Sequence, residues 1–147
     1  MFLSPAIMTR IDFYILQADS EAERIHFAAK LCEKAFRQNM RVMLLTEDLE
    51  AAQRTSEQLW QFKPESFLPH VSAGLADADT PIAISSGEDD VNHHGLLINL
   101  SSDVPSMFSR FQRLAEIVVQ APTTLTATRR QFAYYKARGY PVKTHKL

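Results

Sequence analysis

The sequence has little cysteine and no long apolar run, and each shortage excludes a class of protein. Cys32 is the single cysteine among 147 residues, so no disulfide can form within the chain and a disulfide-stapled fold is excluded. No stretch approaches the ~18 apolar residues that cross a bilayer, and residues 1–7 are too short for a secretory signal peptide. We therefore expect a protein of the reducing cytoplasm with no membrane association.

Glycine is also scarce, which excludes the usual phosphate-binding loops. The four glycines lie far apart and assemble neither G-x-G-x-x-G nor G-x-x-x-x-G-K-[ST]. The first predicted strand-to-helix turn, residues 17–20, contains no glycine, and its Asp19 would repel a pyrophosphate. The sequence therefore predicts no nucleotide site and no cofactor.

Groups suited to catalysis or metal binding are few. No G-x-S-x-G nucleophile motif is present, and Cys32 lies in an apolar helical stripe, where cysteine is typically a small buried hydrophobe. The acidic pair at 89–90 and the histidine pair at 93–94 form the one cluster of potential metal ligands. Because adjacent side chains of an extended loop point in opposite directions, we expect a solvated loop there, no metal, and a binding module rather than an enzyme.

Charge is divided unevenly along the chain, although the net charge is only −1. Residues 1–116 carry all seventeen acidic residues against ten Lys and Arg, which gives −7. Residues 117–147 carry six Lys and Arg and no acid. A basic segment joined to an acidic body suggests an acidic or nucleic-acid partner at the C-terminal end, and a solvated helix face is the alternative.

Alternating strands and helices indicate the fold class. Apolar and β-branched patterns predict strands at residues 10–16, 41–46, 81–85, 96–100 and 116–120. Helices are predicted at about 20–39, 48–60, 105–114 and 124–138, the first opened by an S-x-x-E capping box and the last closed by Gly139. This order is typical of parallel sheets with right-handed crossovers. We expect one three-layer α/β/α domain over residues 9–147 with a mostly parallel central sheet, preceded by a loose extension at residues 1–8.

The last predicted helix carries the densest group of candidate binding residues. Arg129, Phe132 and Lys136 fall at positions i, i+3 and i+7, so they share a helical face. Leu125 and Ala133 lie on or beside the same stripe. An arginine can grip a carboxylate through two charge-assisted hydrogen bonds, while a ring and its aliphatic neighbours bury the apolar part of the same guest. The pattern suggests a receptor for a peptide C-terminus that ends in an aromatic residue.

Two other interpretations of this helix stay open. Phe132 and Tyr135 could simply pack the helix on the sheet, with the cations directed to water. Alternatively, the cations could contact a nucleic-acid backbone while the phenylalanine and tyrosine rings stack on bases.

A second apolar group surrounds the end of the second predicted helix. Trp60, Phe62, Phe67 and Leu68 fall within nine positions, in and beside a proline-bounded loop. That is more apolar area than one helix end usually hides, and such a patch is typical of a protein interface with tryptophan at its energetic centre. Ordinary core packing of Trp60 is the alternative.

Several of these segments resemble the chi subunit of bacterial DNA polymerase III. The matching residues are Phe13-Tyr14, Arg41-Val42, Glu47-Asp48, Leu59-Trp60, the run Pro64–His70 and the closing run Tyr135–Tyr140. The resemblance covers about residues 9–142. It implies a nucleotide-binding-like α/β fold that has no nucleotide site, and a non-catalytic accessory role in DNA replication.

The resemblance also implies partners. Chi proteins pair with the psi subunit, which tethers them to the clamp loader, and they bind the acidic, phenylalanine-terminated tail of single-stranded DNA-binding protein. The family arginine that holds the tail carboxylate corresponds to Arg129, and the aromatic residue that follows corresponds to Phe132. The psi-facing tryptophan and phenylalanine correspond to Trp60 and Phe67, with Leu68 beside them. A repair helicase competing for that patch is a further implication, and DNA contact is expected to be mainly indirect.

The sequence departs from the family at two positions of the tail site. Family lysines correspond to Leu125 and Ala133 here, so two cations are absent, and Lys136 and Arg130 are candidates to compensate. One bidentate arginine and an apolar slot still form a minimal receptor, and many tails on one DNA-bound oligomer raise the effective concentration. We therefore predict an adaptor between the clamp loader and coated DNA. Direct nucleic-acid binding by the basic C-terminal helix is the alternative.

Overall fold

A computed structural model of the chain describes residues 8–62, 70–72, 81–87 and 93–147. Its helices are α1 (Glu21–Arg37), α2 (Leu49–Gln61) and α3 (Pro122–Ala137). Its strands are β1 (Arg10–Ile15), β2 (Val42–Leu45), β3 (His70–Ser72), β4 (Ile82–Ser85), β5 (Leu96–Asn99), β6 (Arg113–Val118) and β7 (Val142–Lys146). Within the described part of the chain, no helix is both long and apolar enough to cross a membrane.

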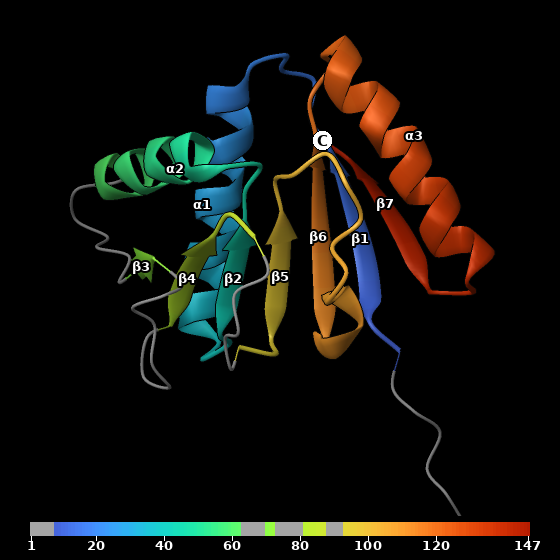
Figure 1. The fold of residues 1–147 in the computed structure, drawn as a ribbon, viewed down its shortest axis with the longest axis horizontal. Helices are drawn as coiled ribbons and strands as arrows, with labels where there is room; N and C mark the ends of the chain where they lie inside the picture. The colour runs from blue at the N-terminus through green and yellow to red at the C-terminus, as the bar shows by residue number, and fades with distance from the viewer. Residues whose placement is uncertain (1–7, 63–69, 73–80, 88–92) are drawn as a thin grey trace, which may run out of the picture.

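The strands form one sheet in the order β3-β4-β2-β5-β6-β1-β7 (Figure 1). Each neighbouring pair of described strands is parallel, which confirms the predicted α/β class with its parallel sheet. Helices α1 and α2 lie together on one side of the sheet, and α3 lies at the β1–β7 end on the other side (Figure 1). The result is the predicted three-layer arrangement.

Two buried clusters fill the space between the sheet and its helices. On the α1 side, Ala28 and Cys32 pack against Val42 and Leu44 of β2. On the α3 side, Tyr135 packs in a cluster that includes Phe13, Phe108 and the alternate β2 residues Met43 and Leu45. Side chains of a strand alternate between its two faces, so strands covered on both sides must be apolar throughout, as β2 is.

The helix ends follow their local sequences. The Ser20 hydroxyl accepts a hydrogen bond from the Glu23 backbone N–H at 3.2 Å, and Asp48 caps α2 in the same way through Ala51 at 2.8 Å. Helix α3 begins at Pro122, slightly earlier than predicted, because proline is pre-organised for a first helical position. It ends before Gly139, whose φ of +80° is the left-handed conformation expected there.

The predicted helix at 105–114 is wrong. Only Phe108–Arg110 forms a short 3-10 turn, and β6 begins at Arg113, before the predicted start at 116. Leu114 and Ala115 pair with β5 on one side and β1 on the other, and this two-sided pairing outweighs the local helical pattern. Two further strands, β3 and β7, were not predicted. Residues 1–7 lie outside the described residues, so the loose extension stays a prediction.

A buried polar network fixes α3 to the sheet. The Tyr135 hydroxyl donates to Glu116 Oε2 at 2.7 Å, and Asn99 Nδ2 donates to the same carboxylate at 2.9 and 3.2 Å. Gln131 donates to the backbone carbonyl of Asp103 at 3.2 Å. Glu116 is only 2% exposed, and this burial raises the pKa of its carboxyl to about 7. Helix α3 is therefore held by directional bonds as well as by apolar packing.

Replacing Glu116 with Gln is expected to change how stability depends on pH. The raised pKa means that, between pH 4.5 and about 7, the folded protein retains a proton that the unfolded chain releases. The free energy of unfolding therefore falls as pH rises through this window. Gln keeps the shape of the protonated carboxyl and cannot ionise. Relative to the original protein, E116Q should gain about 1–3 kcal/mol of stability between about pH 5 and pH 8, since one pKa unit corresponds to about 1.4 kcal/mol.

Urea unfolding of both proteins at the two pH values measures this difference. Glu50→Gln is the matched control, because Glu50 is exposed in the first turn of α2 and belongs to no part of the buried network under α3. A stability difference between E116Q and the original protein that is the same at both pH values would contradict the assignment.

Candidate functional site

The outer face of α3 carries the predicted binding residues together. Arg129, Lys136 and Ala133 are exposed, whereas Gln131 and Tyr135 on the opposite side of the helix are buried. Residues spaced three and four apart share a helical face, so the spacing predicts that these three side chains lie together. The burial of Gln131 and Tyr135 confirms that this face points away from the sheet. We refer to Leu125, Arg129, Phe132, Ala133 and Lys136 as the α3 outer face.

Phe132 lies at the border between this face and the sheet. Its ring meets the buried Phe13 of β1 edge-on, with centroids 5.4 Å apart, and 37% of the residue stays exposed. Leu125 is half-buried and packs against the same cluster. Tyr135, by contrast, is fully buried. The packing interpretation is therefore right for Tyr135, while Phe132 retains an open ring surface.

The two basic side chains of the α3 outer face have no bonding partner among the described residues. Neither Arg129 nor Lys136 makes an ion pair or a side-chain hydrogen bond with any residue that the structure describes. Arg130 lies about 100° further round the helix than Arg129, so it is off this face. Arg138 stacks on the Tyr134 ring, 3.5 Å from its centroid. Of the basic residues on α3, Arg129 and Lys136 are thus the two available on the outer face.

Strand β7 adds a cation that the sequence reasoning missed. Val142 packs in the α3-side cluster, and strand side chains alternate, so Thr144 and Lys146 point to the α3 side as well. Lys146 is exposed. It supplies a positive charge on the same side of the sheet as α3. No local signal identifies it, because its position depends on β7 pairing with β1.

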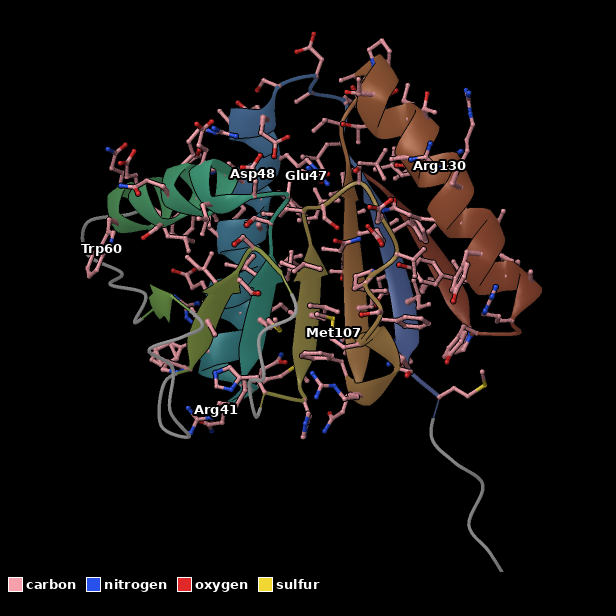
Figure 2. All side chains as sticks on the ribbon, in the orientation of Figure 1. Arg41, Glu47, Asp48, Trp60, Met107 and Arg130 are labelled. Atoms are coloured by element: carbon pink, nitrogen blue, oxygen red, sulfur yellow. The ribbon has the colours of Figure 1, made fainter. Side chains whose placement is uncertain are left out.

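The end of α2 carries the second candidate surface. Trp60 lies in the last turn of α2 and is 54% exposed, so the core-packing alternative is wrong for this residue. Phe62, just beyond the helix, is buried, with its ring 5.3 Å from that of His26. Phe67 and Leu68, the other predicted members of this surface, lie outside the described residues. Figure 2 shows Trp60 at the outer end of α2, on the side of the molecule opposite Arg130 of α3.

A cleft of about 320 Å³ lies at the carboxyl edge of the sheet, where parallel α/β folds usually bind ligands. Two of its charged side chains, those of Arg24 and Glu47, bond to the protein itself. Arg24 donates to the carbonyls of Ile117 and Leu100, and Glu47, labelled in Figure 2, accepts from the backbone and hydroxyl of Ser102 at 2.6 and 2.8 Å. With acids at this edge and no glycine turn after β1, the described residues form no phosphate cradle.

The predicted metal-ligand cluster is described only in part. Asp89 and Asp90 lie outside the described residues. His93 is buried and His94 is exposed, so these adjacent imidazoles have different surroundings. The expectation of a solvated loop is therefore wrong at His93 and stays a prediction for the acidic pair.

Comparison with known proteins gives a family match over nearly the whole chain. Residues 8–143 match the family model described as "DNA polymerase III chi subunit, HolC". A DNA polymerase III subunit chi of Pseudomonas aeruginosa is 40% identical over 140 residues, which cover 95% of this chain and 98% of the relative. Proteins of the same description from Haemophilus influenzae and Escherichia coli are 28% and 26% identical, covering 92% and 93% of this chain and 95% and 97% of theirs. Both candidate surfaces fall inside the matched region.

Proposed function

The chain belongs to the DNA polymerase III chi subunit family, and we propose that it is a non-catalytic adaptor that links the clamp loader to single-stranded DNA-binding protein. In this proposal the α3 outer face binds the acidic C-terminal tail of single-stranded DNA-binding protein. The surface around Trp60 binds the psi subunit of the polymerase. The protein acts in the cytoplasm without metal or cofactor, and its contact with DNA is mainly indirect.

The main support for the tail site is the guanidinium of Arg129, which forms no ion pair with a described residue and lies beside the partly exposed ring of Phe132. Arg129 has no competing acid among the described residues, so its donors are available for a chain-terminal carboxylate. Phe132 packs against Phe13 in an edge-to-face pair and stays 37% exposed, so part of its ring remains available to a guest. Half-buried Leu125 extends the apolar area. A terminal phenylalanine offers the carboxylate and the ring that these groups recognise.

Electrostatics supports an acidic peptide as the guest. Lys136 on α3 and Lys146 on β7 are exposed and provide positive charge for an acidic tail. With Leu125 and Ala133 in place of two lysines, we expect a lower affinity than a fully cationic site would give. Several tails on one DNA-bound oligomer offset this through effective concentration.

The psi site is supported by the exposure of a large aromatic residue. A tryptophan that is 54% exposed on a helix end provides apolar area that a partner can cover. Buried Phe62 anchors the chain immediately behind it. Phe67 and Leu68 complete this surface in our proposal, and a repair helicase is a candidate competitor for it. Since Trp60 and α3 lie on opposite sides of the molecule, both partners can bind at once (Figure 2).

Arg129→Ala is expected to weaken binding of a tail peptide. Removal of a charged hydrogen bond costs about 1.5–3 kcal/mol, so the dissociation constant should rise by roughly 10- to 150-fold in calorimetry. Amidation of the peptide carboxylate should have a similar effect. Arg130→Ala is the matched control, since it removes the same charge from the same helix off the binding face. An equal loss in both variants, or no loss in R129A, would rule out the proposed placement.

Ala133→Lys is expected to strengthen the same interaction. Ala133 is exposed on the α3 outer face, so a lysine fits there without repacking and adds charge beside the acidic tail. An exposed ion pair contributes about 0.3–1 kcal/mol, a two- to five-fold gain that should shrink as salt is added. Ala22→Lys is the control, because Ala22 is exposed on α1, which packs on the opposite side of the sheet from α3. If both lysines raise the affinity equally, the gain reflects net charge rather than the site.

Trp60→Ala is expected to remove psi binding without loss of fold. The side chain is largely exposed, so circular dichroism should be unchanged, while binding to psi in a pull-down should fall by at least about 30-fold, as for a residue worth 2 kcal/mol or more. Leu49→Ala provides the control, because Leu49 is 79% exposed at the other end of α2. Retained psi binding in W60A would refute this assignment.

The second candidate function is direct nucleic-acid binding by the basic C-terminal helix. It is favoured by the excess of positive charge in residues 117–147. It predicts that Arg129→Ala and Arg130→Ala weaken DNA binding alike and reduce its salt dependence. The adaptor proposal predicts that only Arg129→Ala affects the peptide, and that amidation of the peptide matters.

A further inference from the structure

Strand β7 leaves one side of its backbone unpaired. It is the last strand in the order of the sheet, and it is in register with β1 along its whole length (Figure 1). The Ile11 N–H donates to the Pro141 carbonyl, and the Leu147 N–H donates to the Ile15 carbonyl, both at 3.0 Å. In a parallel pair, alternate residues bond to the neighbouring strand, so the backbone groups of residues 141, 143, 145 and 147 face β1.

The intervening residues of β7 direct their backbone groups away from the sheet. Val142, Thr144 and Lys146 point their N–H and C=O groups to the outer edge, and no other described residue forms a backbone hydrogen bond with them. Thr144 and Lys146 are exposed. Unpaired groups of this kind are a template on which an extended peptide adds as a further strand.

Contacts within the sheet hold this edge in place. The Tyr14 ring of β1 stacks on the His145 ring with centroids 4.7 Å apart, and His145 Nε2 lies 2.8 Å from Asp12 Oδ1. Asp12 also accepts a hydrogen bond from Arg113 Nη2 at 3.2 Å, and its side chain is only 4% exposed. Because these contacts fix β7 before a partner arrives, little conformational entropy is lost on its side when a strand is added.

Both faces of the edge are basic. Side chains alternate along a strand, so Lys143 and His145 lie on one face, while Thr144 and Lys146 lie on the face that α3 covers. Residues 117–147 carry six Lys and Arg and no acid. An added strand places its own side chains on the same two faces. A strand with acidic residues at consecutive positions therefore meets a lysine on each face.

The same charges disfavour a second copy of this chain as the added strand. Two β7 strands side by side would bring two basic segments together, and like charges opposite one another are destabilising in a sheet. Lysines on edge strands commonly prevent such self-pairing. An acidic strand carries the opposite charge, so it is stabilised by the lysines that repel a second copy.

We propose that the outer edge of β7 binds an acidic, extended peptide segment of a partner protein, which pairs with the backbone of Val142, Thr144 and Lys146 as an added strand. Backbone hydrogen bonds provide the affinity, and Lys143 and Lys146 select acidic side chains. This site recognises the interior of a peptide and needs no free carboxyl end. The proposal therefore does not rest on binding of a chain terminus at the α3 outer face.

The test uses a peptide of aspartate and valine of about six residues, the usual length of a strand, with both ends blocked so that it offers no terminal carboxylate. Amide hydrogen exchange of the full chain, followed by NMR, reports which groups the peptide covers. The amides of Val142, Thr144 and Lys146 should exchange roughly 10-fold more slowly at saturating peptide, whereas those of Lys143 and His145 are already protected by β1. No binding at low salt, or unchanged exchange at the three outer amides, would overturn the proposal.

Backbone pairing is tested on the original protein with two methylated forms of the same peptide, each methylated at one alternate set of backbone nitrogens. Only one of these sets faces β7 in an added strand. One form should keep its affinity and the other should lose roughly 10-fold or more, because several hydrogen bonds are removed while charge is unchanged. Equal affinities of the two forms, whether retained or lost, would contradict strand addition.

Thr144→Pro tests the same pairing from the protein side. Proline removes an outward donor without removing a bond to β1, so peptide affinity should fall at least about 5-fold. Thr144→Val is the matched control, because valine keeps the backbone N–H and suits a strand. An equal effect of both substitutions would count against backbone recognition, and the methylated peptides decide the question if T144P does not fold.

Selection by charge is tested with Lys143→Gln combined with Lys146→Gln. Loss of two exposed ion pairs should weaken binding of the blocked peptide roughly 3- to 10-fold, and the difference should shrink as salt is added. Lys30→Gln with Arg54→Gln is the control, since it removes the same charge from exposed positions on α1 and α2. An equal loss in the control would show an effect of net charge alone. An equal loss in Arg129→Ala would place the peptide on the α3 outer face, and either result would overturn the proposal.

Discussion

The pairing of β1 between β6 and β7 is the interaction on which both faces at this end of the molecule depend. Every residue of β1 is in register with β6, and β7 continues the pairing on the other side. Side chains of the strand therefore alternate strictly: Phe13 contacts Phe132 on the α3 side, and Tyr14 stacks on His145 on the opposite side. A slip by one residue would exchange the two faces and remove both of these ring contacts at once.

The orientation of α3 follows from the groups buried beneath it. Tyr135 and Gln131 bond to Glu116 and to a carbonyl beyond β5, so the helix cannot rotate without leaving buried polar groups unsatisfied. Burying the Glu116 carboxyl disfavours its ionised form, and the Asn99 and Tyr135 donors offset part of that penalty. The buried network around Glu116, which we expect to lower stability at high pH, thus also orients α3 so that Arg129 faces outward.

The separation of the two candidate surfaces is consistent with the adaptor role that we propose. Trp60 ends α2 on one side of the molecule, and α3 lies on the other (Figure 2). Basic residues gather on α3, β1 and β7, whereas α2 begins beside the acids Glu47 and Asp48. In the proposed function, this charge distribution favours an acidic partner at the β1–β7 end and leaves the α2 end for an apolar partner. Each contact can be weak, because linkage within one assembly supplies the effective concentration.

The sequence by itself determined the strand–helix alternation, the parallel sheet, the lack of a phosphate loop, the start of α1 and the outward stripe at Arg129, Phe132 and Lys136. Those features depend on spacing and capping within a few residues. Only the tertiary structure decided that β6 starts at Arg113, that β7 exists and brings Lys146 to the α3 side, and that Tyr14 meets His145. Edge strands need only one apolar face, and contacts between distant segments leave no periodic pattern, so neither can be found from local sequence.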